Sequence, residues 1–268
     1  MVKKIFVLLA LVGLFVAGCS GQDKLSEAKK LLDAQKLPEA EALYSKATQE
    51  DAQNAAAWNG LGTAQMMQGN TQIALANLGK AIELEKGGKA DKAALGKYYF
   101  DRGLLHYSLA DYESAKPDLQ GAIDNDYETS DAYAYLGVSM GNSGDDISAL
   151  KLLKKSVEIN DKNHFAWSNL GYINSKVGDN KTAIYNLGKA IEIKPDDKVS
   201  YLNRGYTYIG MGDYETALKD IDKALELDPD YLGAVAYKGI ALTNTCLLYT
   251  SDAADDMQCV DLGGRRII

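Results

Sequence analysis

Cysteine, proline and histidine are scarce in this chain of 268 residues. It contains 3 cysteines, 4 prolines and 2 histidines, which excludes a disulfide framework and leaves too few ligands for a zinc cluster. Basic residues are also outnumbered, with 29 lysines and arginines against 37 aspartates and glutamates and a net charge of −8. Because neutralising phosphates requires clustered basic residues, nucleic acid is excluded as a partner, and a partner with a basic surface is favoured.

The residues that are abundant favour helices. Hydrophobic residues make up 46% of the chain, enough for a packed core, and the composition is aliphatic and alanine-rich. A search for a nucleophile with a base, paired carboxylates, metal-ligand spacing or a phosphate-binding loop finds none. We therefore expect no enzymatic activity, no cofactor, no metal and no small-molecule substrate.

The N-terminus has the features of a signal peptide. Lys3 and Lys4 precede an apolar run, residues 5–17, that is too short for an ordinary transmembrane helix. The next residues, Val16-Ala17-Gly18-Cys19, resemble the lipobox of bacterial lipoproteins. The resemblance implies that residues 1–18 are removed, that Cys19 carries the lipid and that residues 19–23 are a short tether. The alternative is a plain signal peptide followed by an incidental cysteine.

Lipidation would place the chain in a bacterial cell envelope. Several acyl chains together anchor a protein almost permanently, because each buried methylene contributes about 0.8 kcal/mol. Ser20 stands where an inner-membrane retention signal of lipoproteins usually has aspartate. The resemblance therefore favours the periplasmic face of the outer membrane over the inner membrane in a Gram-negative cell.

A fixed period organises the body of the chain. Glycines recur every 34 residues, at Gly103, Gly137, Gly171, Gly205 and Gly239. Gly62 takes the same position in the unit before, if seven extra residues are allowed between the two units. Ala28 takes this position in the first unit. The interval matches a class of repeat, about 34 residues long, that folds as stacked helix hairpins.

Other residues recur around these glycines. The fifth unit has, in order, Trp167, Leu170, Gly171, Ala183, Leu187, Ala190 and Pro195. This pattern closely resembles the tetratricopeptide repeat. The resemblance implies an all-α fold, a right-handed superhelix of helix-turn-helix repeats over residues 24–244, with six helix pairs and a truncated seventh. In each pair, a small residue on the first helix lets a large residue of the second approach closely.

The turns inside the pairs repeat as well. Glycines that can adopt the left-handed conformation are expected to end the first helix of a pair, at Gly69, Gly144, Gly178 and Gly212. The next residue is expected to cap the second helix through a side-chain oxygen, at Asn70, Asp111, Asp145, Asp179 and Asp213. Ala110 stands where the third unit would have glycine, which predicts a strained or differently shaped turn.

The seven extra residues lie around Glu85–Asp91. Two adjacent glycines there predict a break between helices, and residues 91–94 are expected to lengthen the next helix by about two turns. Such a joint would bend the superhelix or form a contact loop. The alternative is a tolerated insertion without a role.

The C-terminal residues break the pattern. Residues 245–268 resemble translated sequencing-adapter DNA, and Cys246 and Cys259 both fall within this tail. We expect it to be non-native and the natural protein to continue beyond about Asn244. The first helix of the seventh pair, roughly residues 231–243, would then lack its partner helix and expose Leu232, Val235 and Leu242.

The resemblance also implies where a partner binds. Tetratricopeptide repeats usually hold a peptide or a partner helix on the concave wall formed by the first helices. The matching positions are Asn59, Thr63, Met66, Phe100, Leu104, Tyr107, Tyr135, Val138, Asn142, Phe165, Ser168, Tyr172, Lys176, Leu202, Asn203 and Tyr206. For each ring, the alternative is packing against a neighbouring helix. His106 and His164 belong to different units and are expected to be structural or surface residues.

These observations predict a membrane-anchored scaffold for protein–protein interactions in the bacterial envelope, serving assembly or recruitment of envelope, secretion, pilus or cell-wall machinery. One alternative is a chaperone-like holder of extended exported polypeptides in an aromatic groove. Another is the non-catalytic N-terminal part of a larger protein.

Overall fold

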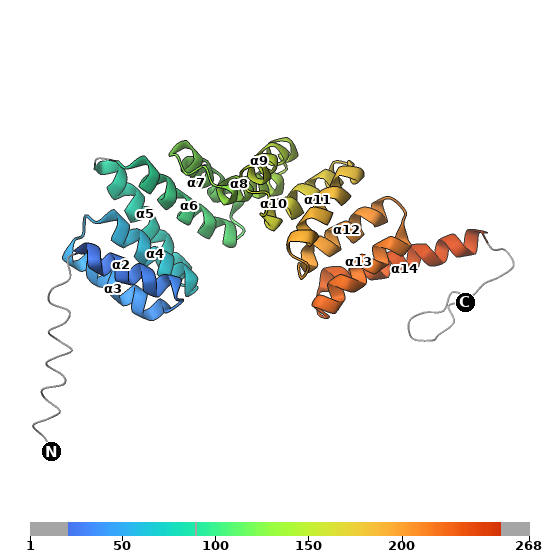
Figure 1. Cartoon of the computed structure of the whole chain (residues 1–268), viewed down its shortest axis with the longest axis horizontal. Helices are drawn as coiled ribbons and strands as arrows, with labels where there is room; N and C mark the ends of the chain where they lie inside the picture. Colours follow the sequence, from blue (N-terminus) through green and yellow to red (C-terminus); the bar gives the residue numbers. More distant parts are fainter. Residues whose placement is uncertain (1–20, 89, 253–268) are drawn as a thin grey trace, which may run out of the picture. The chain divides into compact units, whose positions relative to one another are not determined.

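The computed structural model describes residues 21–88 and 90–252, with side chains described for residues 23–88 and 90–245. Every regular element in these residues is an α-helix, as Figure 1 shows. The chain divides into two compact units, one ending at Glu128 and the other beginning at Thr129. The all-α fold of helix-turn-helix repeats is confirmed, and the handedness of the array stays a prediction.

The helices follow each other as pairs, and we call the first member of each pair helix A and the second helix B. The first unit contains α2 (Gly21–Asp33), α3 (Leu37–Glu50), α4 (Ala55–Met67), α5 (Thr71–Gly87), α6 (Lys92–Ser108) and α7 (Tyr112–Asp124). The second unit contains α8 (Ser130–Asn142), α9 (Asp146–Ile159), α10 (His164–Lys176), α11 (Asn180–Ile193), α12 (Lys198–Gly210), α13 (Tyr214–Leu227) and α14 (Leu232–Asp252). Within the described residues this gives six pairs and a single helix, α14.

Five of the recurring glycines lie where helix A meets helix B of the same pair, whereas a Cβ added at Gly239 on α14 would meet no atom within 4 Å. A Cβ added at Gly171 would lie 2.5 Å from Leu187 Cγ, and one added at Gly205 would lie 2.8 Å from Ile221 Cγ1. Gly62, Gly103 and Gly137 face Leu78, Leu119 and Leu153 in the same way. These large side chains are fully buried. The expected contact of a small and a large residue is therefore present in each pair from the second to the sixth.

The turns between helices A and B have the predicted backbone. Gly69, Gly144, Gly178 and Gly212 have φ between 78° and 90°. Ala110 adopts φ 57° at the equivalent place, so the prediction of a strained turn in the third pair is confirmed. Gln35 holds the same position in the first pair with φ 56°. A left-handed residue thus ends helix A in every pair, whether or not that residue is glycine.

Four of the five predicted caps are confirmed. Asp111, Asp145, Asp179 and Asp213 each accept the backbone N–H three residues later, at 3.0–3.2 Å. Hydrogen bonds from the hydroxyl and then the backbone of Ser114 lower the pKa of Asp111. The prediction for Asn70 is wrong, since its side chain makes no capping bond. Helix α5 begins without this side chain, since the backbone carbonyl of Asn70 accepts the Ala74 N–H at 3.0 Å.

Helix A is capped too, which the repeat pattern did not lead us to predict. Asn54, Thr129, Asn163 and Asp197 precede α4, α8, α10 and α12, and each accepts a backbone N–H from the first turn. Asn163 also donates to the buried Ser130 hydroxyl at 2.9 Å. These caps fix the residue at which each of these helices A begins.

The seven extra residues lengthen two helices. Compared with the register of the other pairs, α5 gains three residues and α6 gains four, and each is 17 residues long. Four residues make about one turn, so the expected lengthening of α6 by two turns is wrong. The reason is that the Asp91 side chain accepts the Ala93 N–H and starts α6 at Lys92. The predicted break between the helices is confirmed, since α5 ends at Gly87.

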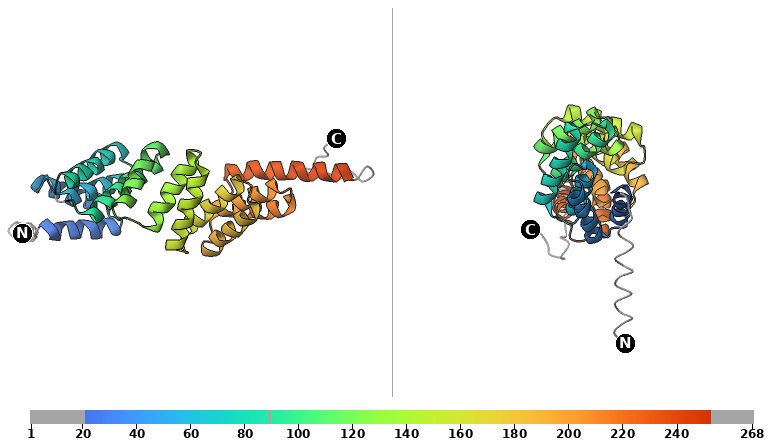
Figure 2. Two further views of the ribbon diagram at one scale, coloured as in Figure 1. Left: turned by 90° about the horizontal axis from the view of Figure 1, so that it is seen from above. Right: turned by 90° about the vertical axis from the view of Figure 1, so that its left-hand side faces the viewer.

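Helix α14 runs farther than expected. It continues to Asp252, past the predicted end near residue 243, because Cys246 and its neighbours offer no glycine turn. Figure 2 shows α14, in red, extending past α12 and α13. Leu232 and Val235 are exposed as predicted, whereas Leu242 is half-buried and that prediction is wrong.

Contacts within each unit place helices A side by side. In the first unit α4 contacts both α2 and α6, and in the second α10 contacts α8 and α12, while α12 also contacts α14. No two B helices contact each other in the described part of either unit. Helices A therefore form a continuous surface in each unit, which we call the A-helix wall.

The glycine contact leads to a paired prediction on stability. Gly171→Ala forces a methyl group to within 2.5 Å of Leu187 Cγ and 3.1 Å of a backbone oxygen, so we expect the free energy of unfolding to fall by about 1–3 kcal/mol. Gly188→Ala is the matched control in α11, where the nearest atom would lie 3.9 Å away. There the gain in helix propensity should raise stability by up to about 1 kcal/mol. Urea denaturation measures both, and a stable Gly171→Ala variant would contradict the packing account.

Candidate functional site

The A-helix wall is hollowed in both units. In the first unit a hollow of about 730 Å³ lies among α2, α4, α6 and Tyr127. In the second a hollow of about 200 Å³ lies between α8 and α10. Both are open depressions in the wall, and both include residues predicted as partner-binding positions.

The hollow of the first unit is mainly apolar. Its lining residues are Leu25, Lys29, Leu32, Asp33, Gln35, Tyr44, Ala56, Asn59, Gly60, Thr63, Met67, Ala93, Ala94, Lys97, Tyr98 and Tyr127. Of these, only Asn59 and Thr63 were predicted. The residues of α2 were missed because the first unit departs from the repeat pattern. Ala93 and Ala94 belong to the extra turn of α6, so the insertion contributes directly to this hollow.

A polar group forms part of the lining. The Asn59 Nδ2 donates to Asp101 Oδ2 at 2.7 Å, and Lys97 Nζ donates to the same oxygen at 2.5 Å. The Oδ1 atom of Asn59 is buried without a hydrogen-bond partner. Burial, and then the carboxylates of Glu85, Asp91 and Asp101, raise the pKa of Tyr98 to about 12. Tyr98 is therefore neutral at physiological pH, and its ring forms part of the apolar lining.

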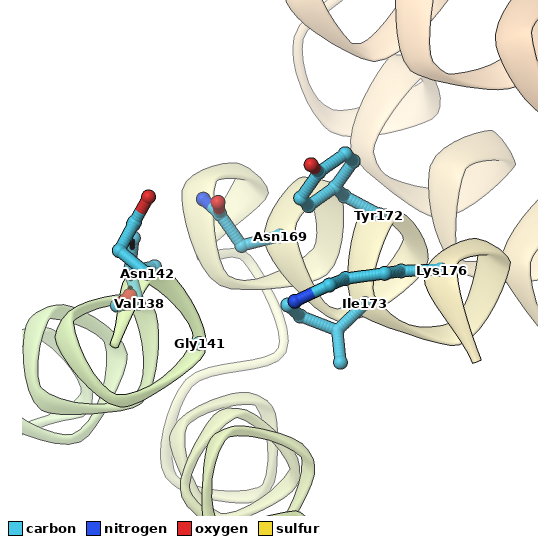
Figure 3. Close-up of a pocket in the computed structure, with 7 residues that line it drawn as sticks. All are labelled: Val138, Gly141, Asn142, Asn169, Tyr172, Ile173 and Lys176. Atoms are coloured by element: carbon cyan, nitrogen blue, oxygen red, sulfur yellow. Dashed lines mark hydrogen bonds between the residues drawn. The ribbon is translucent and has the colours of Figure 1, made fainter. Parts of the chain in front are cut away.

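The hollow of the second unit is smaller and more polar (Figure 3). Val138, Asn142, Tyr172 and Lys176 were predicted for it, whereas Gly141, Asn169 and Ile173 were missed. The missed residues lie on the same helices. Asn169 and Gly141 occupy positions that were predicted in other units, as Asn203 and Tyr107, and only Ile173 matches no predicted position. A Cβ at Gly141 would lie 2.9 Å from Ile173 Cδ1, so these two residues make the close contact of α8 with α10.

Hydrogen bonds hold the polar side chains of this hollow. Lys176 Nζ donates to Asp146 Oδ1 at 2.7 Å, and this bond raises the pKa of Lys176. Asn142 and Asn169 donate through Nδ2 to backbone carbonyls one turn earlier, at 2.9 and 2.8 Å. In Figure 3 the side chains of Asn142, Asn169, Tyr172 and Lys176 surround the hollow. The lysine has its carboxylate partner, so the hollow carries little net charge.

The predicted partner-binding residues fall into two groups by their burial. Asn59, Val138, Ser168 and Leu202 are buried, and Ser168 accepts a hydrogen bond from Ser200 at 2.8 Å. Their side chains therefore take part in contacts between helices. The half-buried or exposed residues are Thr63, Met66, Phe100, Leu104, Tyr107, Tyr135, Asn142, Phe165, Tyr172, Lys176, Asn203 and Tyr206.

Aromatic rings on helices A pack against rings of neighbouring segments. Phe100 contacts Tyr127 and Tyr135 contacts Phe165, both with centroids 5.1 Å apart and planes tilted by 38°. Tyr107 contacts Tyr112 edge to face at 5.8 Å. Tyr206 likewise contacts Tyr237. Five of the predicted residues therefore pack against a ring of a neighbouring segment, which was the alternative to partner binding.

Metal-binding and membrane-spanning features do not occur in the described part of the chain. It has no cluster of three or more metal-ligating side chains. Nor does any helix in that part combine the length and apolarity that crossing a membrane requires. His106 Nδ1 lies 3.3 Å from Asp111 Oδ2, and His164 begins α10. Cys19, the predicted lipid-attachment residue, lies outside the described residues, as do residues 1–18.

Repeated helix pairs with an open A-helix wall define a helical-repeat scaffold. The chain belongs to the tetratricopeptide repeat family, because models of that repeat match residues 25–90, 100–164, 166–197 and 199–231. Proteins of this family mediate protein–protein or peptide interactions. Among curated protein sequences, none matches the chain significantly.

Several solved structures share the fold. YrrB, a tetratricopeptide repeat protein described as having an unusual peptide-binding site, is 24% identical with a TM-score of 0.59, over 73% of this chain and 97% of YrrB. PilF of Pseudomonas aeruginosa is 16% identical with a TM-score of 0.70, over 82% and 97%. A repeat protein from Parabacteroides merdae is 20% identical with a TM-score of 0.65, over 90% and 95%.

Proposed function

We propose that this protein is a non-catalytic scaffold that binds a polypeptide segment on its A-helix wall. The observation that carries the proposal is the hollow of about 730 Å³ in the first unit, which combines apolar walls with the polar group of Asn59, Lys97 and Asp101. Apolar anchors that become buried in such a hollow contribute most of the energy of an interface. The family's role in peptide and protein binding, and the peptide-binding site ascribed to YrrB, support it.

The chemistry of this hollow favours a segment that combines apolar side chains with polar or charged ones. Leu25, Leu32 and Met67 offer apolar contacts to side chains. Lys97 adds a charged side chain to the lining and is paired with Asp101. Lys29 and Asp33 lie on the same lining, so charged residues of either sign can be paired at its edge.

We also propose that the scaffold is anchored in the bacterial cell envelope through a lipid on Cys19, on the periplasmic face of the outer membrane in a Gram-negative cell. The lipobox-like Val16-Ala17-Gly18-Cys19 and the basic and apolar residues before it support this. Because α2 already begins at Gly21, two residues after Cys19, the A-helix wall of the first unit would lie close to the membrane. Recruitment of envelope, secretion, pilus or cell-wall proteins is the role that fits this position.

Binding on the A-helix wall is tested with two matched alanine-to-tryptophan changes. Ala56 lies on α4 and lines the hollow of the first unit, whereas Ala76 is exposed on α5 and does not line it. A peptide is first selected from a random library against the whole chain. Because the indole fills the hollow, Ala56→Trp should weaken its binding by about tenfold or more, while Ala76→Trp should leave it unchanged, as measured by fluorescence anisotropy.

The result that would overturn this proposal is either a library without binders or equal affinity of the two tryptophan variants. The selected sequences also separate the two kinds of binder. One sharp motif indicates a scaffold with a defined partner, whereas broad apolar selectivity indicates a chaperone-like holder of extended polypeptides.

The lipid anchor is tested separately by Cys19→Ser in a bacterial host fed with an alkyne-tagged fatty acid. The original chain should take up the tag and sediment with membranes, because thioether-linked lipid needs the cysteine sulfur. The variant should do neither. Tag uptake that persists in Cys19→Ser, or its absence from the original chain, rules out anchoring at this residue.

A further inference from the structure

A second feature of the A-helix wall is a row of exposed apolar side chains in the second unit. Tyr172, Tyr206 and Ile240 are each one repeat apart, at the same position of α10, α12 and α14, and are 41%, 36% and 46% exposed. We call these three residues the tyrosine row. Val138 holds the same position in α8 but is only 7% exposed, and it lines the hollow next to Tyr172.

The members of the row are close to one another. Helices α10 and α12 are in contact, as are α12 and α14. The Tyr206 ring lies 5.3 Å from the ring of Tyr237 on α14. Burial and then the hydroxyls of Tyr206, Tyr172 and Tyr231 raise the pKa of Tyr237. The contacts of α12 with α10 and with α14 thus place the three members of the row on successive neighbouring helices.

The surroundings of the row are uncharged, in a chain whose net charge is −8. Asn169 and Asn203 hold equivalent places on α10 and α12, three positions before the tyrosines. Lys176 is paired with Asp146 at 2.7 Å. A surface without net charge gives no electrostatic preference to an acidic or basic ligand, so it is complementary to an uncharged one.

Spacing decides the conformation of such a ligand. Helices in contact lie about 8–10 Å apart, which sets the distance between equivalent positions on α10, α12 and α14. A polyproline II helix rises about 3.1 Å per residue with three residues per turn, so it presents one face about every 9.3 Å. An extended strand presents one face about every 6.6 Å, which does not match. An α-helix presents one face about every 5.4 Å, and two turns span about 10.8 Å, so neither spacing matches.

We propose that the tyrosine row binds an uncharged, proline-rich segment in the polyproline II conformation, with one proline of every three against Tyr172, Tyr206 and Ile240. This inference rests on the proposed function and names the ligand class of the second unit. The flat faces of the tyrosines suit pyrrolidine rings. The hollow beside Tyr172 receives the next side chain of the segment.

Hydrogen bonding fits the same ligand. Proline lacks a backbone N–H, and a polyproline II segment leaves its carbonyl oxygens without internal partners. The hydroxyls of Tyr172 and Tyr206 are donors that can reach such oxygens. The segment is also rigid before it binds, so little conformational entropy is lost.

The test is titration of fluorescein-labelled dodecapeptides into the whole chain, followed by fluorescence anisotropy. The probes are dodecaproline, an uncharged alanine- and glutamine-rich helical peptide, and an uncharged serine-, threonine- and valine-rich peptide. Dodecaproline should bind at least about tenfold more tightly than the other two. Tyr172→Ala and Tyr206→Ala should each weaken it by about fivefold to tenfold.

Two further variants separate ring contact from folding defects. Tyr172→Phe keeps the ring and loses the hydroxyl donor, so it should weaken the binding of dodecaproline by a smaller factor than Tyr172→Ala does. Tyr185→Ala removes a tyrosine that is 59% exposed on helix B α11, and it should leave binding unchanged. Circular dichroism confirms that each variant retains its helices.

Failure of this inference differs from failure of the proposed function. The inference is overturned if dodecaproline does not bind, or if it binds Tyr172→Ala as tightly as the original chain. The scaffold proposal still stands in that case if Ala56→Trp abolishes the binding of a library peptide. If the helical peptide binds best and depends on Tyr172, the ligand class is wrong. If neither dodecaproline nor any library peptide binds, both proposals fall.

Discussion

The contact between a glycine on helix A and a leucine or isoleucine on helix B is the constraint on which the rest of the structure depends. Because no Cβ stands at Gly171, the Leu187 side chain reaches the backbone of α10 and becomes fully buried. This sets how closely the two helices pack, and the recurrence of the contact in each repeat passes the same geometry to the next pair. The A-helix wall, its hollows and its tyrosine row all follow from that regular spacing.

Function on this scaffold resides in the positions that the packing leaves free. Equivalent positions on successive A helices are either enclosed by neighbours, as Val138 is, or exposed, as Tyr172 is. Where the first unit departs from the repeat, α2 and the lengthened α6 enclose a larger hollow around Asn59 and Lys97. The two units therefore offer different binding chemistry on the same framework: a wide apolar hollow in one and an uncharged aromatic row in the other.

Sequence reasoning recovered the repeat because the glycine period, the turn residues and the aspartate caps are local signals. It failed where the outcome depended on a neighbour. The Asn70 side chain does not cap α5, although the equivalent aspartates cap their helices. The seven extra residues were shared between two helices because Asp91 starts α6. Arg102 and Arg204 take the position that leucine holds in the second, fourth and fifth units. Each binds an aspartate of helix B, Asp118 or Asp220, through two hydrogen bonds of 2.6–2.7 Å. Such a pair is visible only once the hairpin is built. The binding positions carried over from the family lie on helices A, but the pattern did not tell which of their side chains packing would bury.

The central claim is that a polypeptide binds the A-helix wall of this protein. Nuclear magnetic resonance titration of the isotope-labelled chain with its tightest library peptide tests this claim most directly. Amide signals of helices A, such as those of Thr63 and Tyr172, should shift or broaden on binding, while those of the outward-facing Ile73 and Tyr185 should stay in place. Changes concentrated on helices B, or no changes at saturating peptide, would contradict the account.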